Sequence, residues 1–294
     1  QKLAQDKQLA NETIDHLQHL NAAQRQALQA QINQLPTRDE VAQKVAQAEA
    51  LDESMKALRD IIQDHQQVES SSPFINEDSL EQNAYTNAIQ QTEALINQTD
   101  HPTLDRTQVQ QLTQAVTNAK DHLHGDEKLQ NDKQLAVNNL NQLSGLNDAQ
   151  RDAFESQINQ APTRNMVAES IAQANALNQA MVSLRNAIQN EPQVESSSQF
   201  INEDTPEQEA YKQAVSNAKA IINETTNPIM DKAQVDQTLQ EVNDAIANLH
   251  GDQKLAQAQQ QAIIGLDGLN NLNHDQLESA KDAVNQTPTR NDVA

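Results

Sequence analysis

The chain repeats itself at a distance of 126 residues, and this repetition constrains its fold more than any other feature. The stretch VESSSPFINEDSLEQNAY at residues 68–85 returns as VESSSQFINEDTPEQEAY at residues 194–211. The stretch PTRDEVA at residues 36–42 returns as PTRNMVA at 162–168 and as PTRNDVA at 288–294. A period this long is that of a domain, and it exceeds the ankyrin and TPR periods. We therefore expect a tandem array of two repeats and the first third of another.

Composition restricts the cores that such an array can build. Hydrophobic residues make up 36% of the chain and aromatic residues 2%, so several small cores of Leu, Ile, Val and Ala are expected in place of one large core. The net charge of −22 opposes binding to nucleic acid and favours a monomer. No apolar run reaches membrane-spanning length, so this segment is not expected to be membrane-embedded. Without cysteine, neither disulfides nor thiol chemistry are available.

Helix caps recur through the sequence. An Asn, Ser or Thr side chain at an N-cap accepts from an unpaired backbone N–H, and a Gln or Glu three residues later reaches back. No sustained alternation of apolar and polar residues indicates a strand. The chain is therefore predicted to be all-α. The candidate capping boxes are Asn21 with Gln24, Asn147 with Gln150, Asn273 with Gln276, Thr37 with Glu40, Ser79 with Gln82, and Thr205 with Gln208.

Each repeat is predicted to hold five helices. In the first repeat they cover about residues 2–19, 22–34, 38–66, 80–98 and 105–124. Five helices form two three-helix bundles only when one helix serves both, and the helix at 38–66 is the candidate. The fold class expected is an elongated string of alternating three-helix bundles joined by long shared helices, without flexible linkers.

The apolar seam of the long helix supports this sharing. Its spacings are 4, 3, 3, 4, 3 and 4, and they are identical in the second repeat. Two consecutive threes swing the seam around the helix, so that it faces one bundle and then the next. The residues of the seam are Val41, Val45, Ala48, Leu51, Met55, Leu58 and Ile62, with copies Val167, Ile171, Ala174, Leu177, Met181, Leu184 and Ile188. The segment His124-Gly125-Asp126 could end one helix and start another with an Asp cap, or a second connecting helix could continue through Gly125, and the same choice recurs at Gly251. The continuous or gently kinked helix is favoured, because no proline or polar spacer intervenes.

The few aromatic residues concentrate in one repeated segment. Phe74, Ile75 and Tyr85 stand where the chain leaves the long helix and turns back, and their copies are Phe200, Ile201 and Tyr211. These residues could plug the open end of an aromatic-poor core, or they could form an exposed ligand patch. The plug is favoured, because few other side chains here can fill such a space. We treat them as a structural signature.

Chemical motifs are weak in this sequence. His16 and His19 have a metal-binding spacing, but no third ligand recurs. The pairs Glu77-Asp78 and Glu203-Asp204 lack calcium-loop spacing and precede helix starts, where negative charge is stabilising. No nucleophile elbow, phosphate loop or paired-carboxylate signature is present. We therefore expect no enzyme activity, no catalytic or cofactor-binding residues and no metal site.

Two stretches resemble known modules. Residues 2–48, from KLAQDKQLANETIDHLQHL to VAQKVAQA, resemble a GA module, a three-helix module named for its albumin-binding members. INEDSLEQNAYTNAIQQTEALINQT at 75–99, with VQQLTQAVTNAKDHLHGDEKL at 109–129, resembles a FIVAR module of bacterial surface proteins. Their alternation resembles the repeat region of giant staphylococcal matrix-binding proteins. The domains implied are GA-like bundles at 1–50 and 126–176, FIVAR-like bundles at 38–124 and 164–250 that share the long helices (38–66 in the first repeat), and a truncated third GA-like bundle at 252–294.

The resemblance implies an adhesin associated with the cell wall. It implies a rod-like segment on the cell surface that binds an extracellular matrix protein such as fibronectin, weakly per repeat. Two alternatives are an albumin-binding module and a module that binds cell-wall polysaccharide. Albumin binding is not expected, because the second helix of the first GA-like stretch, NAAQRQALQAQIN at 21–33, lacks an aromatic anchor, and its copy has only Phe154.

Overall fold

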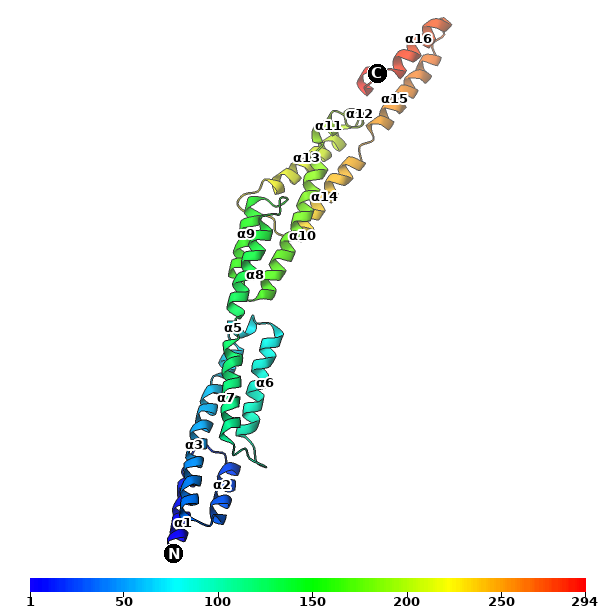
Figure 1. Ribbon diagram of the computed structural model, residues 1–294. Helices are drawn as coiled ribbons and strands as arrows, with labels where there is room; N and C mark the ends of the chain where they lie inside the picture. The colour runs from blue at the N-terminus through cyan, green and yellow to red at the C-terminus, as the bar shows by residue number, and fades with distance from the viewer. The chain divides into compact units, whose positions relative to one another are not determined.

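All of the regular secondary structure is helical and none is strand, which confirms the all-α prediction (Figure 1). The computed structural model describes residues 1–294. The chain divides into two compact units: residues 1–132 with 162–164, and residues 133–161 with 165–294. None of the helices combines the length and apolar character needed to cross a membrane. The helices are α1 (Lys2–Asp15), α2 (Ala22–Gln34), α3 (Arg38–Ile62), α4 (His65–Glu69), α5 (Ser72–Ile75), α6 (Ser79–Ile96), α7 (Arg106–Asp121), α8 (Gly125–Leu140), α9 (Asp148–Gln160), α10 (Arg164–Ile188), α11 (Glu191–Glu195), α12 (Ser198–Ile201), α13 (Thr205–Ile222), α14 (Lys232–Ala247), α15 (Gly251–Asp267), α16 (His274–Asn285) and α17 (Arg290–Val293).

Helix α3 organises the first compact unit. It packs against α1 and α2 and also against α6 and α7 (Figure 1). One core cluster runs along it, joining Ile14 and Leu28 of the first two helices to Leu95 and Val109 of the last two. The seam residues lie in this cluster, and Ile62 also contacts a second cluster around Tyr85. The seam residues Val41, Ala48, Leu51, Met55 and Leu58 are each at most 3% exposed, while Val45 and Ile62 are partly buried.

The predicted long helix at 38–66 ends four residues early, so this boundary was wrong. The backbone turns at residues 63–64 and restarts as α4 at His65. The N–H of Gln63 bonds the carbonyl of Asp60 three residues back, which tightens the last turn. A signal was present in the second repeat, where Pro192 occupies the position of Gln66. Proline removes an interior helix hydrogen bond, so a helix that continued through this position was unfavourable.

The connection between α7 and α8 corrects the expectation of a continuous or kinked helix. Helix α7 ends at Asp121, and α8 begins at Gly125. Between them, the N–H of His124 donates to a carboxylate oxygen of Glu77 at 2.5 Å. The same break lies between α14 and α15, where the N–H of His250 donates to Glu203. A carboxylate from outside the helix thus pairs with one backbone N–H at each break.

Local capping chemistry was predicted well. The capping boxes that begin at Asn21, Thr37, Asn147 and Asn273 all form. In the box at Thr37, the hydroxyl of Thr37 also donates to the carboxylate of Glu40. The boxes at Ser79 and Thr205 do not form. Asp78 and Asp204 are the N-caps there, and Gln82 and Gln208 donate instead to the carbonyls of Phe74 and Phe200.

The first helix is shorter than the predicted range of 2–19. It ends at Asp15, and a turn leads into α2. The carboxylate of Asp52 on α3 accepts from the N–H groups of His19 and Leu20 at 2.8 and 3.1 Å. These bonds hold the turn between α1 and α2 against the long helix α3.

In the second compact unit, the copy of this seam lies on α10. Its seam residues Val167, Ala174, Leu177, Met181 and Leu184 are at most 3% exposed. Helices α13 and α14 pack together, and their small core gathers Phe200, Tyr211, Val215 and Leu249. Helices α15 and α16 pair, and α17 packs against α15.

Candidate functional site at the module joint

In the first unit, polar side chains form a site where three of the repeated sequence segments contact one another. Asn76, Glu77 and Asp78 lie between α5 and α6. They contact the HGD segment at 124–126 and the PTR segment at 162–164. We call this site the joint: Asn76, Glu77 and Asp78 together with Gly125, Lys128 and Arg164.

Asn76 binds the backbone where the PTR segment begins a helix. Its side-chain oxygen accepts from the N–H of Arg164 at 2.9 Å, and its side-chain nitrogen donates to the carbonyl of Pro162 at 3.2 Å. The residue is 2% exposed. An amide side chain is suited to this position, because it offers both a donor and an acceptor.

Glu77 caps the start of α8. Its side chain is fully buried and accepts from the N–H of His124 and, at 2.8 Å, from the N–H of Asp78. It also pairs with the ammonium group of Lys128. Burial would raise the pKa of Glu77, but the bonds from Lys128, Asp78 and His124 outweigh it and hold that pKa below the ordinary value. A carboxylate here also interacts favourably with the positive end of the α8 dipole.

Asp78 joins two cations from different segments. Its oxygens lie 2.6 Å from the ammonium of Lys128 and 2.6 Å from the guanidinium of Arg164. The hydrogen bonds from these two groups lower the pKa of Asp78. Arg164 also binds Asp132 on α8 at 2.6 Å. The guanidinium therefore holds two carboxylates at once, which its planar fork of donors allows.

Gly125 is required by the close approach of two backbones. A Cβ at this position would lie 2.7 Å from the carbonyl carbon of Asn76 and from the nitrogen of Glu77, and still closer to the carbonyl oxygen of Pro73. Only glycine lets α8 begin directly against the segment that supplies its cap.

The second compact unit holds a second joint with the same chemistry. Asn202 binds Pro288 and Arg290, and Asp204 pairs with both Lys254 and Arg290. Gly251 meets the backbone of residues 199 and 203 as closely as Gly125 does in the first joint. One partner differs: Ala258 stands where the first joint has Asp132. A hollow of about 530 Å³ lies beside Ala258 and Arg290.

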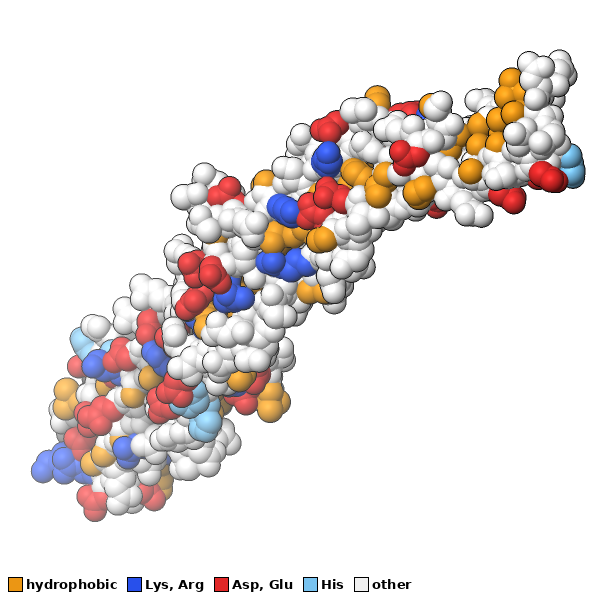
Figure 2. Space-filling view, turned by 90° about the horizontal axis from the view of Figure 1, so that it is seen from above, with side chains coloured by type: hydrophobic (Ala, Val, Ile, Leu, Met, Phe, Trp, Pro, Cys, Tyr) orange, Lys and Arg blue, Asp and Glu red, His pale blue; other side chains and the backbone are white.

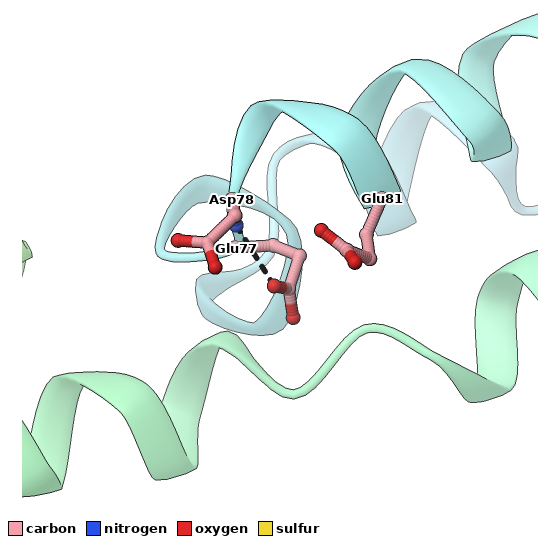
Figure 3. Close-up of side chains that lie close together, drawn as sticks. All are labelled: Glu77, Asp78 and Glu81. Atoms are coloured by element: carbon pink, nitrogen blue, oxygen red, sulfur yellow. Dashed lines mark hydrogen bonds between the residues drawn. The ribbon is translucent and has the colours of Figure 1, made fainter.

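The three carboxylates Glu77, Asp78 and Glu81 lie near one another, within 4.8 Å (Figure 3). Figure 3 also shows the bond from the Asp78 N–H to Glu77. Such a group could in principle hold a metal ion. Here Lys128 forms ion pairs with Glu77 and Asp78, and Arg164 forms one with Asp78, so the arrangement is that of an ion-pair network.

The aromatic signature residues lie beside the first joint. Phe74 and Tyr85 make an edge-to-face contact with ring centroids 5.9 Å apart, and Tyr85 is fully buried. Phe200 and Tyr211 repeat this contact at 5.7 Å. Ile75 and Ile201 do not fill the core, since they are 48% and 49% exposed. They sit at the ends of four-residue helices in which Phe74 and Phe200 pack against the core.

Sequence reasoning missed the joint itself. Asn76 and Arg164 are 88 residues apart, and Glu77 and His124 are 47 apart, so no local pattern connects them. The sequence did carry a signal: the short segments INED, HGD and PTR each recur unchanged at the same spacing of 126 residues. Strings that repeat together while their surroundings vary are candidates for contact with one another.

Family models match all of the chain except residues 125 and 251. The FIVAR domain matches residues 54–124 and 180–250. The GA module matches residues 1–54, 126–180 and 252–294. The boundary at residue 54 falls inside α3, and the boundary at 180 falls inside α10.

Curated proteins and a solved structure are similar to this chain over most or all of its length. It is 58% identical over 294 residues to the extracellular matrix-binding protein ebh of Staphylococcus aureus, and covers 3% of that protein. It is also 58% identical to the extracellular matrix-binding protein EbhA of another S. aureus strain, and covers 4% of it. A crystal structure of an EbhA domain from S. aureus has a TM-score of 0.70 and 33% identity, over 79% of this chain and 92% of that one.

Proposed function

This chain belongs to the family of repeat proteins built from alternating GA modules and FIVAR domains, and we propose that it is an adhesive segment that binds extracellular matrix. The observation that carries the proposal is the 58% identity, along all 294 residues, to proteins named for matrix binding. Its modules are not enzymes. The chain spans only 3–4% of the length of these relatives, so it would contribute a small part of such a protein's adhesion.

The surface is suited to many weak contacts. Figure 2 shows one face on which acidic, basic and apolar side chains are interspersed with neutral polar ones. The single aromatic residue of the second GA-module helices, Phe154, is 2% exposed and packs in the core. It is therefore not available as an anchor for a partner pocket, which weighs against a specific albumin site.

Fibronectin is the matrix component we propose, with weak binding by each repeat. Weak sites in tandem reach high avidity when several bind at once, without any new contact. We further propose that the segment works outside the cell, at the cell wall, as a monomer. The net charge of −22 supports the monomer, because copies of the chain repel one another.

Parallel binding to immobilised fibronectin, albumin and wall polysaccharide tests this function. Tandem arrays of one, two and four 126-residue repeats would be compared at equal repeat concentration. The proposal expects fibronectin binding that strengthens with repeat number, and little albumin binding. Sub-micromolar binding of a single repeat to albumin, or selective binding to polysaccharide, would favour the alternative of a specific module.

A further inference from the structure

Arg290 of the second joint has donors that bond to nothing in the protein. Its Nη1 donates to the carboxylate of Asp204 at 2.6 Å and to the carbonyl of Asn202 at 3.1 Å. Its backbone N–H donates to the side-chain oxygen of Asn202 at 2.8 Å. Its Nε and Nη2 have no hydrogen-bond partner. The guanidinium is therefore fixed through Nη1, while its other edge is available.

The corresponding donor is occupied in the two other GA modules. Nε of Arg164 donates to Asp132 at 2.6 Å, and Nε of Arg38 donates to Asp6. These two aspartates are 126 residues apart, and Ala258 stands at the same position on α15 of the third module. A methyl group accepts no hydrogen bond. The third module therefore keeps the arginine but lacks the carboxylate that binds it elsewhere.

The hollow of about 530 Å³ lies beside this free edge. Ala258 and Arg290 line it, together with Ile201, Gln208 and Asn291. Most of the lining side chains are polar, and Ile201 is the one large apolar side chain among them. A volume of this order accommodates a small molecule and exceeds the space that one carboxylate needs.

The opening results from the alanine on α15, and not from the part of the chain that follows Arg290. At the first joint, the chain continues past Arg164 as α10, and the acceptor for Nε is still Asp132 on α8. Near the second joint, the carboxylate of Asp292 accepts from the hydroxyl of Thr289 at 2.6 Å. It makes no hydrogen bond to Arg290.

We propose that this hollow is a binding pocket for a small polar carboxylate, which binds the Nε and Nη2 edge of Arg290 in the place that Asp132 has at the first joint. The two oxygens of a carboxylate match this edge of a guanidinium in a bidentate arrangement. The source of the carboxylate is a free organic acid or the acidic side chain of a peptide, since both present the same group. The pocket is separate from the matrix binding proposed above and does not require it.

Charge balance favours such a ligand. At the first joint, two cations pair with three carboxylates. At the second joint, two cations pair with only two carboxylates. A bound carboxylate gives the second joint the charge arrangement that the chain already forms at the first joint.

The test is a titration of the full chain with sodium acetate, followed by nuclear magnetic resonance. The eight arginines are isotope-labelled, and Arg290→Lys identifies the Nε–Hε signal of Arg290. That signal should shift and saturate, whereas the signals of Arg38 and Arg164 should not move, because Asp6 and Asp132 occupy their Nε groups. The pair is partly exposed, so we expect half-saturation at about 1 mM or above. Sodium chloride at equal ionic strength is the control, and an equal shift with chloride overturns the proposal.

Two reciprocal variants locate the binding. Ala258→Asp restores the carboxylate within the chain and should weaken acetate binding at Arg290 by about tenfold or more, because an intramolecular partner competes at a high effective concentration. Asp132→Ala should open the same pocket at the first joint, so that the signal of Arg164 now shifts with acetate. Each variant copies a residue that the other joint already carries, so both should fold. Acetate binding that is unchanged in Ala258→Asp, together with no response of Arg164 in Asp132→Ala, overturns the proposal.

A peptide arm distinguishes the two sources of the carboxylate. The blocked peptide Gly-Glu-Gly is titrated beside its Gly-Gln-Gly counterpart, which lacks the negative charge. A shift of the Arg290 signal with acetate alone assigns the pocket to free organic acids, and a shift with the Glu peptide shows that an acidic side chain also enters. Equal shifts with the Glu and Gln peptides, or no shift with any carboxylate, contradict the proposal.

Discussion

Two glycines on α15 should respond in opposite ways to the same substitution. Gly251 faces backbone, and a Cβ there would lie 2.8 Å from the carbonyl carbon of Gln199 and from the nitrogen of Glu203. Gly265 lies on the same helix with nothing within 4 Å of its added Cβ. Neither position has a left-handed backbone, so the available space decides the outcome.

The magnitude follows from these distances. To restore ordinary contact at 3.4 Å, the carbonyl carbon of Gln199 and the nitrogen of Glu203 must retreat by about 0.6 Å, and the carbonyl oxygen of Gln199, which lies closer still, must retreat further. Overpacking of this kind costs about 1–3 kcal/mol. The retreat also stretches the bond from the His250 N–H to the Glu203 carboxylate, and weakening a bond to a charged group costs up to about 1–2 kcal/mol. Gly251→Ala should therefore destabilise the second unit by about 2–4 kcal/mol, whereas Gly265→Ala should stabilise it by about 1 kcal/mol through helix propensity.

Thermal melting followed by circular dichroism gives the first measurement. For a unit of this size the loss corresponds to a fall in Tm of roughly 5–15 °C. Hydrogen exchange then locates the effect, which should appear at α12 and the first turn of α15. Gly125→Ala provides a replicate in the first unit, where an added Cβ would likewise approach the carbonyl oxygen of Pro73 and the nitrogen of Glu77 too closely. If Gly251→Ala were as stable as Gly265→Ala, the close approach of backbones would not be needed and our account of the joint would be wrong.

Three further predictions concern the pH response, the buried hydroxyls and α3. The pKa of Glu77 is lowered from its ordinary 4.5 and that of Asp78 from 3.8. The two carboxylates therefore contribute fully to the free energy of unfolding above about pH 5, and this contribution is lost as the pH falls through the lowered values. In an acid titration, the stability of Glu77→Gln should depend less on pH than that of the parent protein. The hydroxyls of Tyr85 and Tyr211 are buried without a hydrogen-bond partner, and burial raises the pKa of each to about 12. Tyr85→Phe and Tyr211→Phe should therefore keep or raise the Tm. A clear fall in Tm would show that the hydroxyls are hydrogen-bonded. Ala48→Pro should cost about 3 kcal/mol or more and increase hydrogen exchange in both α1 and α7, whereas an effect limited to α1 would mean that α3 does not couple the two bundles.

The elements of the fold were predictable because their causes are local. The seam residues Val41 to Ile62 recur at helical spacing, and capping residues such as Asn21 and Asn147 mark helix starts within four residues of sequence. The end of the long helix was less predictable from the first repeat alone. There, Gln63 and Asp64 are compatible with a helix, and only Pro192 in the other repeat opposes it.

The joint was not predictable in the same way, because it depends on contacts across the chain. Asp78 appears locally as an acidic residue just before a helix start, where negative charge is stabilising. In the structure its carboxylate turns to Lys128 and Arg164, from segments 50 and 86 residues away. The helix N-terminus of α6 thus loses a side-chain cap while the joint gains an ion pair. Local rules predict the first role and contain nothing about the second.

The joints also explain how modules can touch in so acidic a chain. The sequence has 42 acidic and 20 basic residues, so two surfaces chosen at random repel each other. At the second joint, which lies within one compact unit, Lys254 and Arg290 neutralise Glu203 and Asp204 between a FIVAR domain and the following GA module. Contact is thus favourable where the paired cations lie and is opposed by charge elsewhere. This distribution specifies which surfaces dock within the array, and we propose that the remaining negative charge opposes association of separate chains.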